Sequence, residues 1–321
     1  MPAITATAPG KIILCGEHAV VYGQPAIAVP VSQVKARAII SAQPNQTRGR
    51  INIQAPDIGL MTNLEDLPIN HPLAVAVKLV LGATEIDKPP ALTLRVTSTI
   101  PIASGLGSGA AVSVATMRAL SEFLGKPLAD ETVSALTFEV EKLYHGTPSG
   151  IDNSVITYEK PIYFVKDSAE ARGELQTIRV CMPFRFVIGD TGIASPTAAA
   201  VGDVRKSWQA DRSLFQGYFE STGEIVDRAR QVLEAGEPAA LGELMDENQE
   251  ILEKIGVSCP ELEQLIHAAR LAGAYGAKLS GGGRGGNMIA LVSKETESQV
   301  ASALKEAGAT QILYSTVANL N

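Results

Sequence analysis

A glycine-rich run near the middle of the chain has the composition of a phosphate-binding turn. It reads PIASGLGSGAA from Pro101 to Ala111. Glycines let backbone N–H groups approach a phosphate without side-chain clashes. A helix beginning near Ser108 would add unpaired N–H donors and the positive end of its dipole. The run lacks the lysine of a Walker loop and the spacing of a dinucleotide-binding loop, so a tight connection remains the alternative at this point.

Two carboxylates further along could serve a phosphate site. Asp152 lies in the run PSGIDN, from Pro148 to Asn153, and Glu141 lies eleven residues earlier. A turn shaped by proline and glycine can present an acid to a cleft, and a carboxylate beside phosphate oxygens suits Mg²⁺. The alternatives are a helix-capping aspartate for Asp152 and a solvated helix charge for Glu141.

The opening run also carries candidate groups. It reads PGKIILCGEHAVVYG from Pro9 to Gly23, with Lys11 at the start of an apolar strand, where an unpaired charge is costly. Glu17 and His18 follow a glycine on a predicted turn between strands, and a structural histidine is the alternative for His18. A late run, KLSGGGRGGN from Lys278 to Asn287, indicates either a flexible linker or a second close approach to ligand or nucleotide.

Hydrophobic periodicity predicts the elements that position these runs. Strands are expected at 11–14, 26–31, 34–41, 51–55, 92–98, 161–165, 184–190, 288–292 and 311–315. Helices are expected at 71–81, 109–124, 131–145, 198–215, 218–234, 239–255 and 259–272. The first glycine-rich run therefore lies between a strand and a helix, which is the order that a phosphate-binding turn requires. Because strands and helices do not simply alternate, we expect an α+β fold with two lobes, residues 1–185 and 186–321.

Composition limits the classes of function. The chain has 321 residues, 45% hydrophobic and 19% charged, with a formal net charge of −7. This charge gives no reason to expect nucleic acid or an anionic membrane as partner. The three cysteines are scattered and odd in number, which is typical of a reducing compartment. No secretory signal and no apolar run of membrane-spanning length is evident, so we expect a cytoplasmic protein.

Taken in this order and spacing, the runs resemble those of the GHMP kinases, and the resemblance covers nearly the whole chain. The versions PGKIILCGEHAVVYGQPAIA, PIASGLGSGAA, EKLYHGTPSGIDN and KLSGGGRGG are most similar to those of the mevalonate kinase branch. Galactokinases would show an aspartate two residues after the Gly-Glu-His of the opening run, where this chain has Val20. The resemblance implies a two-lobed α+β fold with an N-terminal lobe like that of ribosomal protein S5 and a helix-rich C-terminal lobe with an antiparallel sheet.

The resemblance also implies roles for particular residues. Asp152 would be the catalytic base, and Lys11 would lie beside it and help to activate the substrate hydroxyl. Glu17, His18 and Thr197 would contact the substrate. The ATP phosphates would be bound by Pro101, Ala103, Ser104, Gly105, Leu106, Gly107, Ser108, Gly109 and Ala110. Glu141 and Ser108 would bind Mg²⁺. The implied reaction is phosphorylation of the C5 hydroxyl of mevalonate by ATP.

One position departs from the family pattern. Where the family usually has a second serine in the glycine-rich loop, with its hydroxyl on magnesium, this chain has Gly109. Either Ser108 supplies the oxygen or a water completes the octahedron, which Mg²⁺ tolerates. The departure affects the second metal ligand and leaves the class of reaction unchanged.

Three rival functions stay open at this point. A phosphomevalonate kinase would need extra cations in the pocket, for which Lys278 and Arg284 are the nearby candidates. A non-catalytic GHMP-like binding protein should have lost Lys11 or Asp152. A decarboxylase would release carbon dioxide after phosphorylation. Oligomeric state is also open, and a homodimer is compatible with the sequence.

Overall fold

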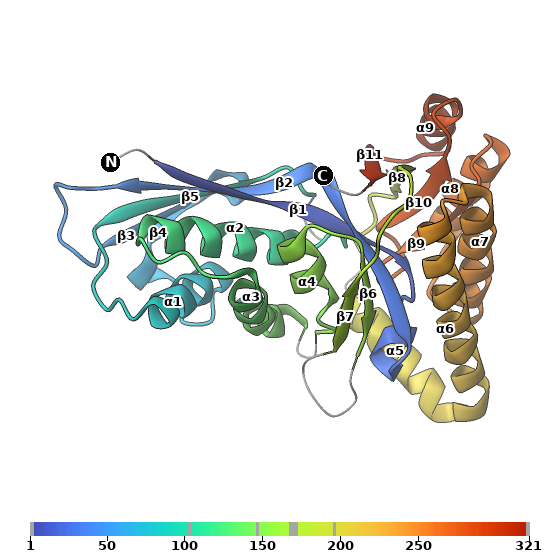
Figure 1. Ribbon diagram of the computed structural model, residues 1–321, viewed down its shortest axis with the longest axis horizontal. Helices are drawn as coiled ribbons and strands as arrows, with labels where there is room; N and C mark the ends of the chain where they lie inside the picture. Colours follow the sequence, from blue (N-terminus) through green and yellow to red (C-terminus); the bar gives the residue numbers. More distant parts are fainter. Residues whose placement is uncertain (1–2, 102–104, 146–147, 167–172, 195–196, 319–321) are drawn as a thin grey trace.

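Two β-sheets organise the chain, each with its own set of helices (Figure 1). The computed structural model describes residues 3–101, 105–145, 148–166, 173–194 and 197–318. In these ranges a seven-stranded sheet forms before residue 178 and a four-stranded sheet after residue 183. The mixed α+β architecture is therefore the one that the sequence predicts. The division at residue 185 falls inside a strand and stays a prediction.

A long antiparallel hairpin runs through the first lobe and reaches the second. It consists of β1 (Ile4–Cys15) and β2 (Pro25–Ala42), joined by a turn that contains the short helix η1 (Ala19–Tyr22). From Gln33 onward, buried and more exposed side chains of β2 alternate, because the helices cover one face of the strand and the other faces solvent. Before Val31 almost every residue is buried, as expected where the hairpin passes between the lobes.

The other strands of the first sheet pair outward from β2. The order is β4–β3–β5–β2–β6–β7, and β1 pairs with the opposite edge of β2. Strands β5 and β6 share one edge of β2, pairing with residues 36–42 and 25–28 respectively. Their bounds are β3 Ile51–Ala55, β4 Leu60–Asn63, β5 Leu92–Ser98, β6 Ile162–Val165 and β7 Glu174–Thr177.

Four helices cover one face of this sheet (Figure 1). They are α1 Pro72–Thr84, α2 Ser108–Phe123, α3 Asp130–His145 and α4 Ile151–Tyr158; two short helices, η2 Pro56–Ile58 and η3 Leu64–Asp66, lie in loops. Helix α2 packs against β1 and β2, while α3 and α4 pack against α2 and each other. The face of α2 toward the sheet is rich in alanine, which lets the helix approach the hairpin closely.

The second lobe combines the sheet β11–β8–β10–β9 with a stack of helices. Its strands are β8 Phe184–Asp190, β9 Gly276–Ser280, β10 Asn287–Val292 and β11 Gln311–Val317, all antiparallel. Its helices are α5 Thr197–Ala210, α6 Arg212–Ala235, α7 Pro238–Lys254, α8 Pro260–Leu271 and α9 Glu297–Glu306. Within the described ranges no helix is both long and apolar enough to cross a bilayer.

Several predicted boundaries differ from the structure for identifiable reasons. The predicted strands 26–31 and 34–41 are one strand, β2, in spite of Pro30. Pro30 pairs with Lys11 of β1 and lies between the segments of β2 that pair with β6 and β5, so a proline there removes no hydrogen bond on the β5/β6 side. The break predicted between two helices near 215–218 lies at Asp211, whose side chain accepts from the Leu214 N–H and caps α6.

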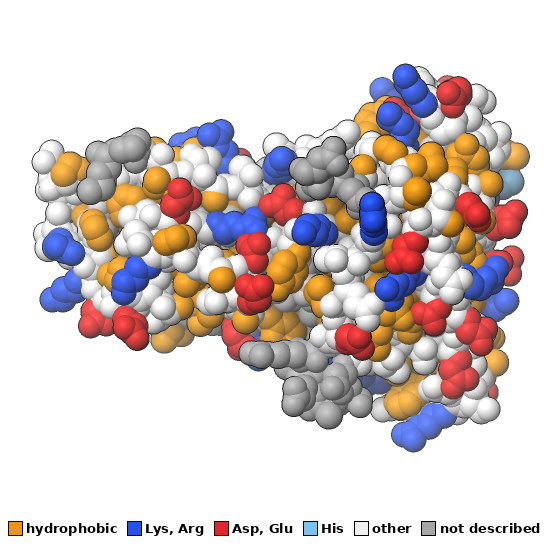
Figure 2. Space-filling model, viewed as in Figure 1, with side chains coloured by type: hydrophobic (Ala, Val, Ile, Leu, Met, Phe, Trp, Pro, Cys, Tyr) orange, Lys and Arg blue, Asp and Glu red, His pale blue; other side chains and the backbone are white. Residues whose placement is uncertain are grey.

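Charges of both signs are interspersed over the face drawn in Figure 2, on the first lobe as well as the second. Neither the Lys and Arg side chains nor the Asp and Glu side chains drawn there form one continuous block. On this face an anionic ligand would be attracted by individual groups and helix ends, and not by a broad single-sign field.

Candidate active site

The glycine-rich loop after β5 docks on β1. The backbone N–H of Lys11 donates to the carbonyl oxygen of Leu106 at 3.0 Å, and Leu106 is buried. Gly107 adopts a φ of +74° and directly precedes α2. A Cβ at Gly107 would lie 2.7 Å from Cδ1 of Ile156 and 3.0 Å from Cγ of Lys11. Only glycine fits here without displacing Lys11, so this glycine serves a close approach as well as a turn.

Helix α2 begins at Ser108, as expected for the glycine-rich run and one residue before the range 109–124 that periodicity predicts. Its first turn, with Gly109 and Ala110, leaves backbone N–H groups without partners inside the helix, at the positive end of the dipole. Gly105 precedes it with a φ of +79° and is exposed. The described part of the predicted phosphate-binding run therefore lies directly before the N-terminus of a helix, and its role in binding phosphate stays a prediction. Of the predicted ATP contacts, Ala103 and Ser104 lie outside the described residues, and Pro101 lies half-buried before them.

Lys11 and Asp152 meet beside this loop. The Nζ of Lys11 lies 2.9 Å from Oδ1 of Asp152, with the lysine side chain 6% and the aspartate side chain 24% exposed. The prediction placed Asp152 on a turn. It lies instead in the first turn of α4, directly after Gly150, which has a φ of +95° and packs against Phe164. A carboxylate that can take a proton and an ammonium that can stabilise developing charge therefore lie together and partly open to solvent.

Helix α4 is only two turns long, so contacts from neighbouring helices must hold it. Near its N-terminus, the side-chain amide of Asn153 donates to the carbonyl oxygen and to the hydroxyl of Ser134 on α3, at 3.2 and 2.8 Å. The hydroxyl of Ser154 donates to the carbonyl oxygen of Gly150 at 2.7 Å. Asp152 therefore lies in a helical turn that is bonded to α3 through its neighbour Asn153.

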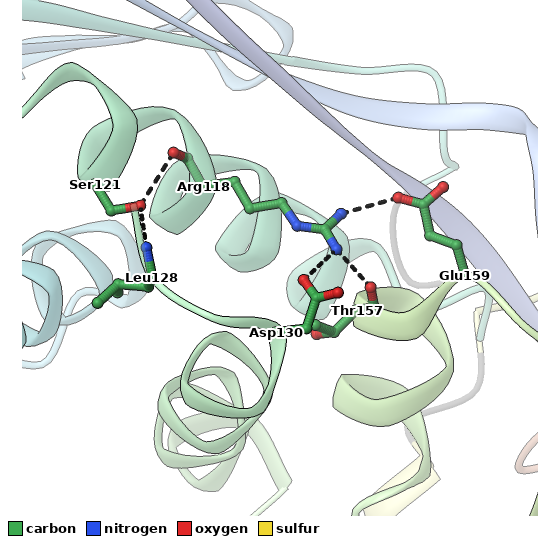
Figure 3. A network of polar contacts seen from close by, with 6 residues as sticks. All are labelled: Arg118, Ser121, Leu128, Asp130, Thr157 and Glu159. Atoms are coloured by element: carbon green, nitrogen blue, oxygen red, sulfur yellow. Dashed lines mark hydrogen bonds and ion pairs between the residues drawn. The ribbon is translucent and has the colours of Figure 1, made fainter. Parts of the chain in front are cut away.

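At the other end of α4, Arg118 of α2 joins three helices (Figure 3). Its guanidinium donates to the carbonyl oxygen of Thr157 at 2.5 Å and pairs with Glu159 and Asp130 at 2.9 Å each. Thr157 lies in the last turn of α4, where a cation is favoured by the dipole, and Asp130 begins α3. The sequence analysis did not identify this arginine, because its partners lie 12 to 41 residues away.

The turn between β1 and β2 holds His18 in an unusual backbone conformation. Its φ is +61°, and the preceding Gly16 has a φ of +101° and lies against Ala26. The Nε2 of His18 lies 3.0 Å from the carbonyl oxygen of Gly282. Burial lowers the pKa of His18 to about 4, so the ring is neutral and carries its hydrogen on Nε2. Nδ1 is then an acceptor, buried and without a hydrogen-bond partner among the described residues.

Thr197 comes to the same place from the second lobe. Thr197 is the first residue of α5. A Cβ built on Gly282 would lie 3.1 Å from both Cα and Oγ1 of Thr197. Gly282 therefore touches both Thr197 and His18. The structure brings these two predicted substrate contacts together although 178 other residues separate them in sequence.

Glu17 is fully buried and forms an ion pair with Lys278, which is also fully buried. Burial raises the pKa of Glu17, and the ammonium of Lys278 opposes that rise. Lys278 opens the late run that was interpreted as either a flexible linker or a second close approach to ligand. It lies instead on β9, and only the glycines after Ser280 form the loop. Arg284 in that loop pairs with Asp203 of α5 at 2.6 Å. Both cations that a phosphorylated substrate could have used are therefore already paired.

Glu141 lies on α3 and is 3% exposed, so the alternative that it is a solvated surface charge is wrong. Within the described ranges no three Asp, Glu, His or Cys side chains gather as a ready-made metal site. A single carboxylate such as that of Glu141 nevertheless fits Mg²⁺, which needs only one or two carboxylates beside ATP oxygens and water. Ser108, the other predicted ligand, is half-buried at the first position of α2.

Comparison with known proteins identifies relatives of the whole chain. The model of the GHMP kinases N terminal domain matches residues 70–160, and that of the GHMP kinases C terminal domain matches residues 229–310. The chain is similar to mevalonate kinase of Pyrococcus horikoshii, with 38% identity over 95% of this chain and 93% of that protein.

Solved structures give the same result. The structure of L. major mevalonate kinase in complex with R-mevalonate superposes with a TM-score of 0.84 at 33% identity, covering 98% of this chain and 95% of that chain. Methanococcus jannaschii mevalonate kinase gives a TM-score of 0.87 at 25% identity, covering 99% of each chain. These matches confirm the predicted two-lobed fold.

Proposed function

Since the chain belongs to the GHMP kinase family, and within it to the mevalonate kinases, we propose that it transfers the γ-phosphoryl group of ATP to the C5 hydroxyl of mevalonate. The products are 5-phosphomevalonate and ADP. The observation that carries this proposal is the Lys11–Asp152 pair, at 2.9 Å, beside the glycine-rich loop and the first turn of α2. A base, a cation and an anion-binding helix end are the parts that phosphoryl transfer to an alcohol needs.

Asp152 takes the proton of the C5 hydroxyl as the hydroxyl oxygen attacks the γ-phosphorus of ATP. The 24% exposure of its side chain leaves room for a substrate oxygen to reach the carboxylate. Lys11 is held by its backbone bond to Leu106 and by the close fit at Gly107, so its ammonium keeps a fixed position as charge develops. Fixed charges of this kind accelerate the reaction because they need no reorganisation at the moment of transfer.

The phosphates of ATP lie against the run from Pro101 to Ala110 in this proposal. Gly105 and Gly107, both with positive φ, let the backbone approach the phosphates, and the N–H groups that begin α2 donate to their oxygens. Glu141 and Ser108 would hold Mg²⁺, which would supply positive charge against the phosphate oxygens.

Glu17, His18 and Thr197 contact mevalonate. Neutral His18 offers Nδ1, and Glu17 offers Oε2, as buried acceptors without partners among the described residues. The C5 hydroxyl of mevalonate gives its proton to Asp152, and the C3 hydroxyl can donate to one of these two acceptors. Buried polar atoms without partners are uncommon in proteins, and completion of the site by a ligand explains them here.

Two rival functions are less well supported. A phosphomevalonate kinase needs free cations for the additional phosphate, whereas Lys278 and Arg284 are paired with Glu17 and Asp203. A non-catalytic binding protein has no use for the pair of Lys11 and Asp152.

We further propose a cytoplasmic enzyme that acts without nucleic acid or membrane, with lobes of residues 1–185 and 186–321. A homodimer is compatible with this proposal.

A coupled assay of ADP release tests the substrate. It compares mevalonate, phosphomevalonate, homoserine and galactose at equal concentrations, with ATP and Mg²⁺ in excess. We expect the highest kcat/KM with mevalonate, and a product heavier than mevalonate by one phosphoryl group with no carbon dioxide released. A higher kcat/KM with phosphomevalonate would refute the assigned reaction, and release of carbon dioxide would indicate a decarboxylase.

A further inference from the structure

The second lobe contacts the opening run of the first lobe along the free edge of its sheet. Strand β9 lies at the end of the strand order and, in the described chain, pairs only with β10. The hydroxyl of Ser280 accepts from the backbone N–H of Ile13 at 3.1 Å and donates to the carbonyl oxygen of Ile13 at 2.9 Å. The end of β9 is thus bonded directly to β1, two residues from Lys11.

Two residues before Ser280, Lys278 makes the most buried of these contacts. Its ammonium binds Oε1 of Glu17 and donates to the carbonyl oxygen of Leu279 at 2.6 Å. Both charged side chains have no exposed surface. Removing such charges from water is so costly that apolar residues of similar volume are often equally stabilising. Stability of the fold therefore does not by itself explain a lysine at this position of β9.

The partner of Lys278 belongs to the most strained turn of the site. Gly16 and His18, on either side of Glu17, have φ angles of +101° and +61°. A non-glycine residue in this region is strained and persists only when its surroundings hold it. Here the second lobe holds it on both sides, through Lys278 on Glu17 and through the carbonyl oxygen of Gly282 on His18.

We propose that Lys278 is a positioning residue for the acceptor substrate. By binding one carboxylate oxygen of Glu17 across the two lobes, it fixes the turn of residues 16–18 so that the other oxygen of Glu17 and Nδ1 of His18 are presented together as hydrogen-bond acceptors. The proposal rests on the function proposed above, in which these two residues contact the substrate. It assigns to the second lobe a direct part in acceptor recognition that does not require Lys278 itself to touch the substrate.

The geometry separates this role from charge balance alone. A positive charge anywhere near Glu17 would offset its burial, but the ammonium binds Oε1 alone and leaves Oε2 without a partner among the described residues. Lys278 is itself fixed by the carbonyl oxygen of Leu279, whose N–H donates to the side chain of Gln249 on α7 at 2.9 Å. The position of the Glu17 carboxylate is thus fixed relative to β9 and α7 of the second lobe.

Steady-state kinetics of Lys278→Met test the proposal. The matched control is Lys126→Met, which likewise loses a lysine bonded to a backbone carbonyl, that of Thr84 at 2.6 Å, in the loop after α2. We expect Lys278→Met to raise KM for the acceptor about tenfold or more, the effect of losing a buried charged hydrogen bond, with KM for ATP within about twofold of the parent. The control should change neither. The acceptor used is the one that the parent phosphorylates best, so an error in the proposed substrate leaves this test intact.

An acceptor KM within about twofold of the parent, or equal rises in both KM values, would overturn the proposal. If Lys278→Met does not fold, the double variant Glu17→Gln with Lys278→Met, which leaves no charge unpaired, replaces it. Glutamine keeps an oxygen for Lys278, so we expect the double variant to have an acceptor KM about threefold or more above that of Glu17→Gln alone. Equal values for the two would mean that Lys278 only balances the charge of Glu17.

Discussion

Replacing Gly107 by alanine tests whether the glycine-rich loop and the Lys11–Asp152 pair are one packed unit. The new Cβ would lie 2.7 Å from Cδ1 of Ile156 and 3.0 Å from Cγ of Lys11. Ile156 is buried on α4, the helix that carries Asp152, and Lys11 is paired with Asp152 at 2.9 Å. The methyl group would therefore press at once on Lys11 and on the helix that carries Asp152, the proposed catalytic pair.

The magnitude follows from two separate costs. A left-handed backbone costs alanine roughly 1–2 kcal/mol, offset by about 0.4–1 kcal/mol because alanine restricts the unfolded chain. Overpacking a filled site adds about 1–3 kcal/mol. Gly125, at the far end of α2, has a similar φ of +72° but nothing within 4 Å of a built Cβ. It lies roughly 25 Å along the helix from Gly107, so Gly125→Ala carries the backbone cost alone.

Urea unfolding and steady-state kinetics of the two variants separate these costs. We expect Gly107→Ala to lower the free energy of unfolding by about 1–3 kcal/mol more than Gly125→Ala. Its kcat should fall roughly tenfold to a hundredfold, because small displacements of reacting groups cost that much, while Gly125→Ala keeps the parental kcat. Equal losses of stability together with a parental kcat for Gly107→Ala would refute the close packing of the loop against Lys11.

Two further predictions concern the metal and the histidine. Glu141→Gln should raise the Mg²⁺ concentration needed for half-maximal rate, and Gly109→Ser should lower it or leave it unchanged, by restoring a hydroxyl ligand; a magnesium titration with no shift in Glu141→Gln would contradict the metal role. Because the pKa of His18 is lowered to about 4 in the folded state, the unfolded chain binds the proton more readily as pH falls from about 6.5 to 4, and stability declines in that window. Between pH 7 and 4.5 the stability of His18→Gln, measured by urea unfolding, should decline less than that of the parent, by up to roughly 2.4 kcal/mol. An identical pH profile in parent and variant would show that His18 is not buried in its neutral form.

Elements with a clear period and flanking punctuation were predictable from the sequence. Strand β5 has the predicted bounds Leu92–Ser98, and α2 is shifted by one residue at each end. In both cases apolar residues recur at one period over the whole element, and the ends are marked by glycine or proline. Gly107 was therefore placed correctly before a helix. Lys11 was placed correctly on a strand but not at its start, because β1 begins at Ile4.

Short elements rich in glycine or bounded by it were not predictable. Helix α4 has eight residues after a Pro-Ser-Gly turn, too few to show a helical period, so Asp152 was assigned to the turn. Strand β9 has five residues that begin with a glycine and adjoin a glycine-rich loop. Both are stabilised by tertiary contacts, α4 by Arg118 and Asn153 and β9 by pairing with β10. Local sequence carries no information about such contacts.

The contacts between the two lobes could not be predicted from the sequence either. Glu17 and Lys278 are 261 residues apart, and nothing in either run indicates the other. A signal was nevertheless present, since Lys278 stands between Ala277 and Leu279 in a run without other charges up to Arg284. A charge in an apolar strand predicts a buried partner. That argument was applied to Lys11, where the structure places Asp152 beside it, and it applies equally to Lys278.

The central claim is that Asp152, paired with Lys11, accepts the proton of the substrate hydroxyl. The most direct test is the rate of phosphoryl transfer in Asp152→Asn at saturating mevalonate, ATP and Mg²⁺, with ATP binding measured alongside. Asparagine has nearly the same shape as aspartate but does not take the proton, so the account predicts a rate lower by roughly 10²–10⁴-fold with ATP affinity unchanged. Retention of more than about a tenth of the parental rate would contradict it, and would mean that catalysis here rests on positioning alone.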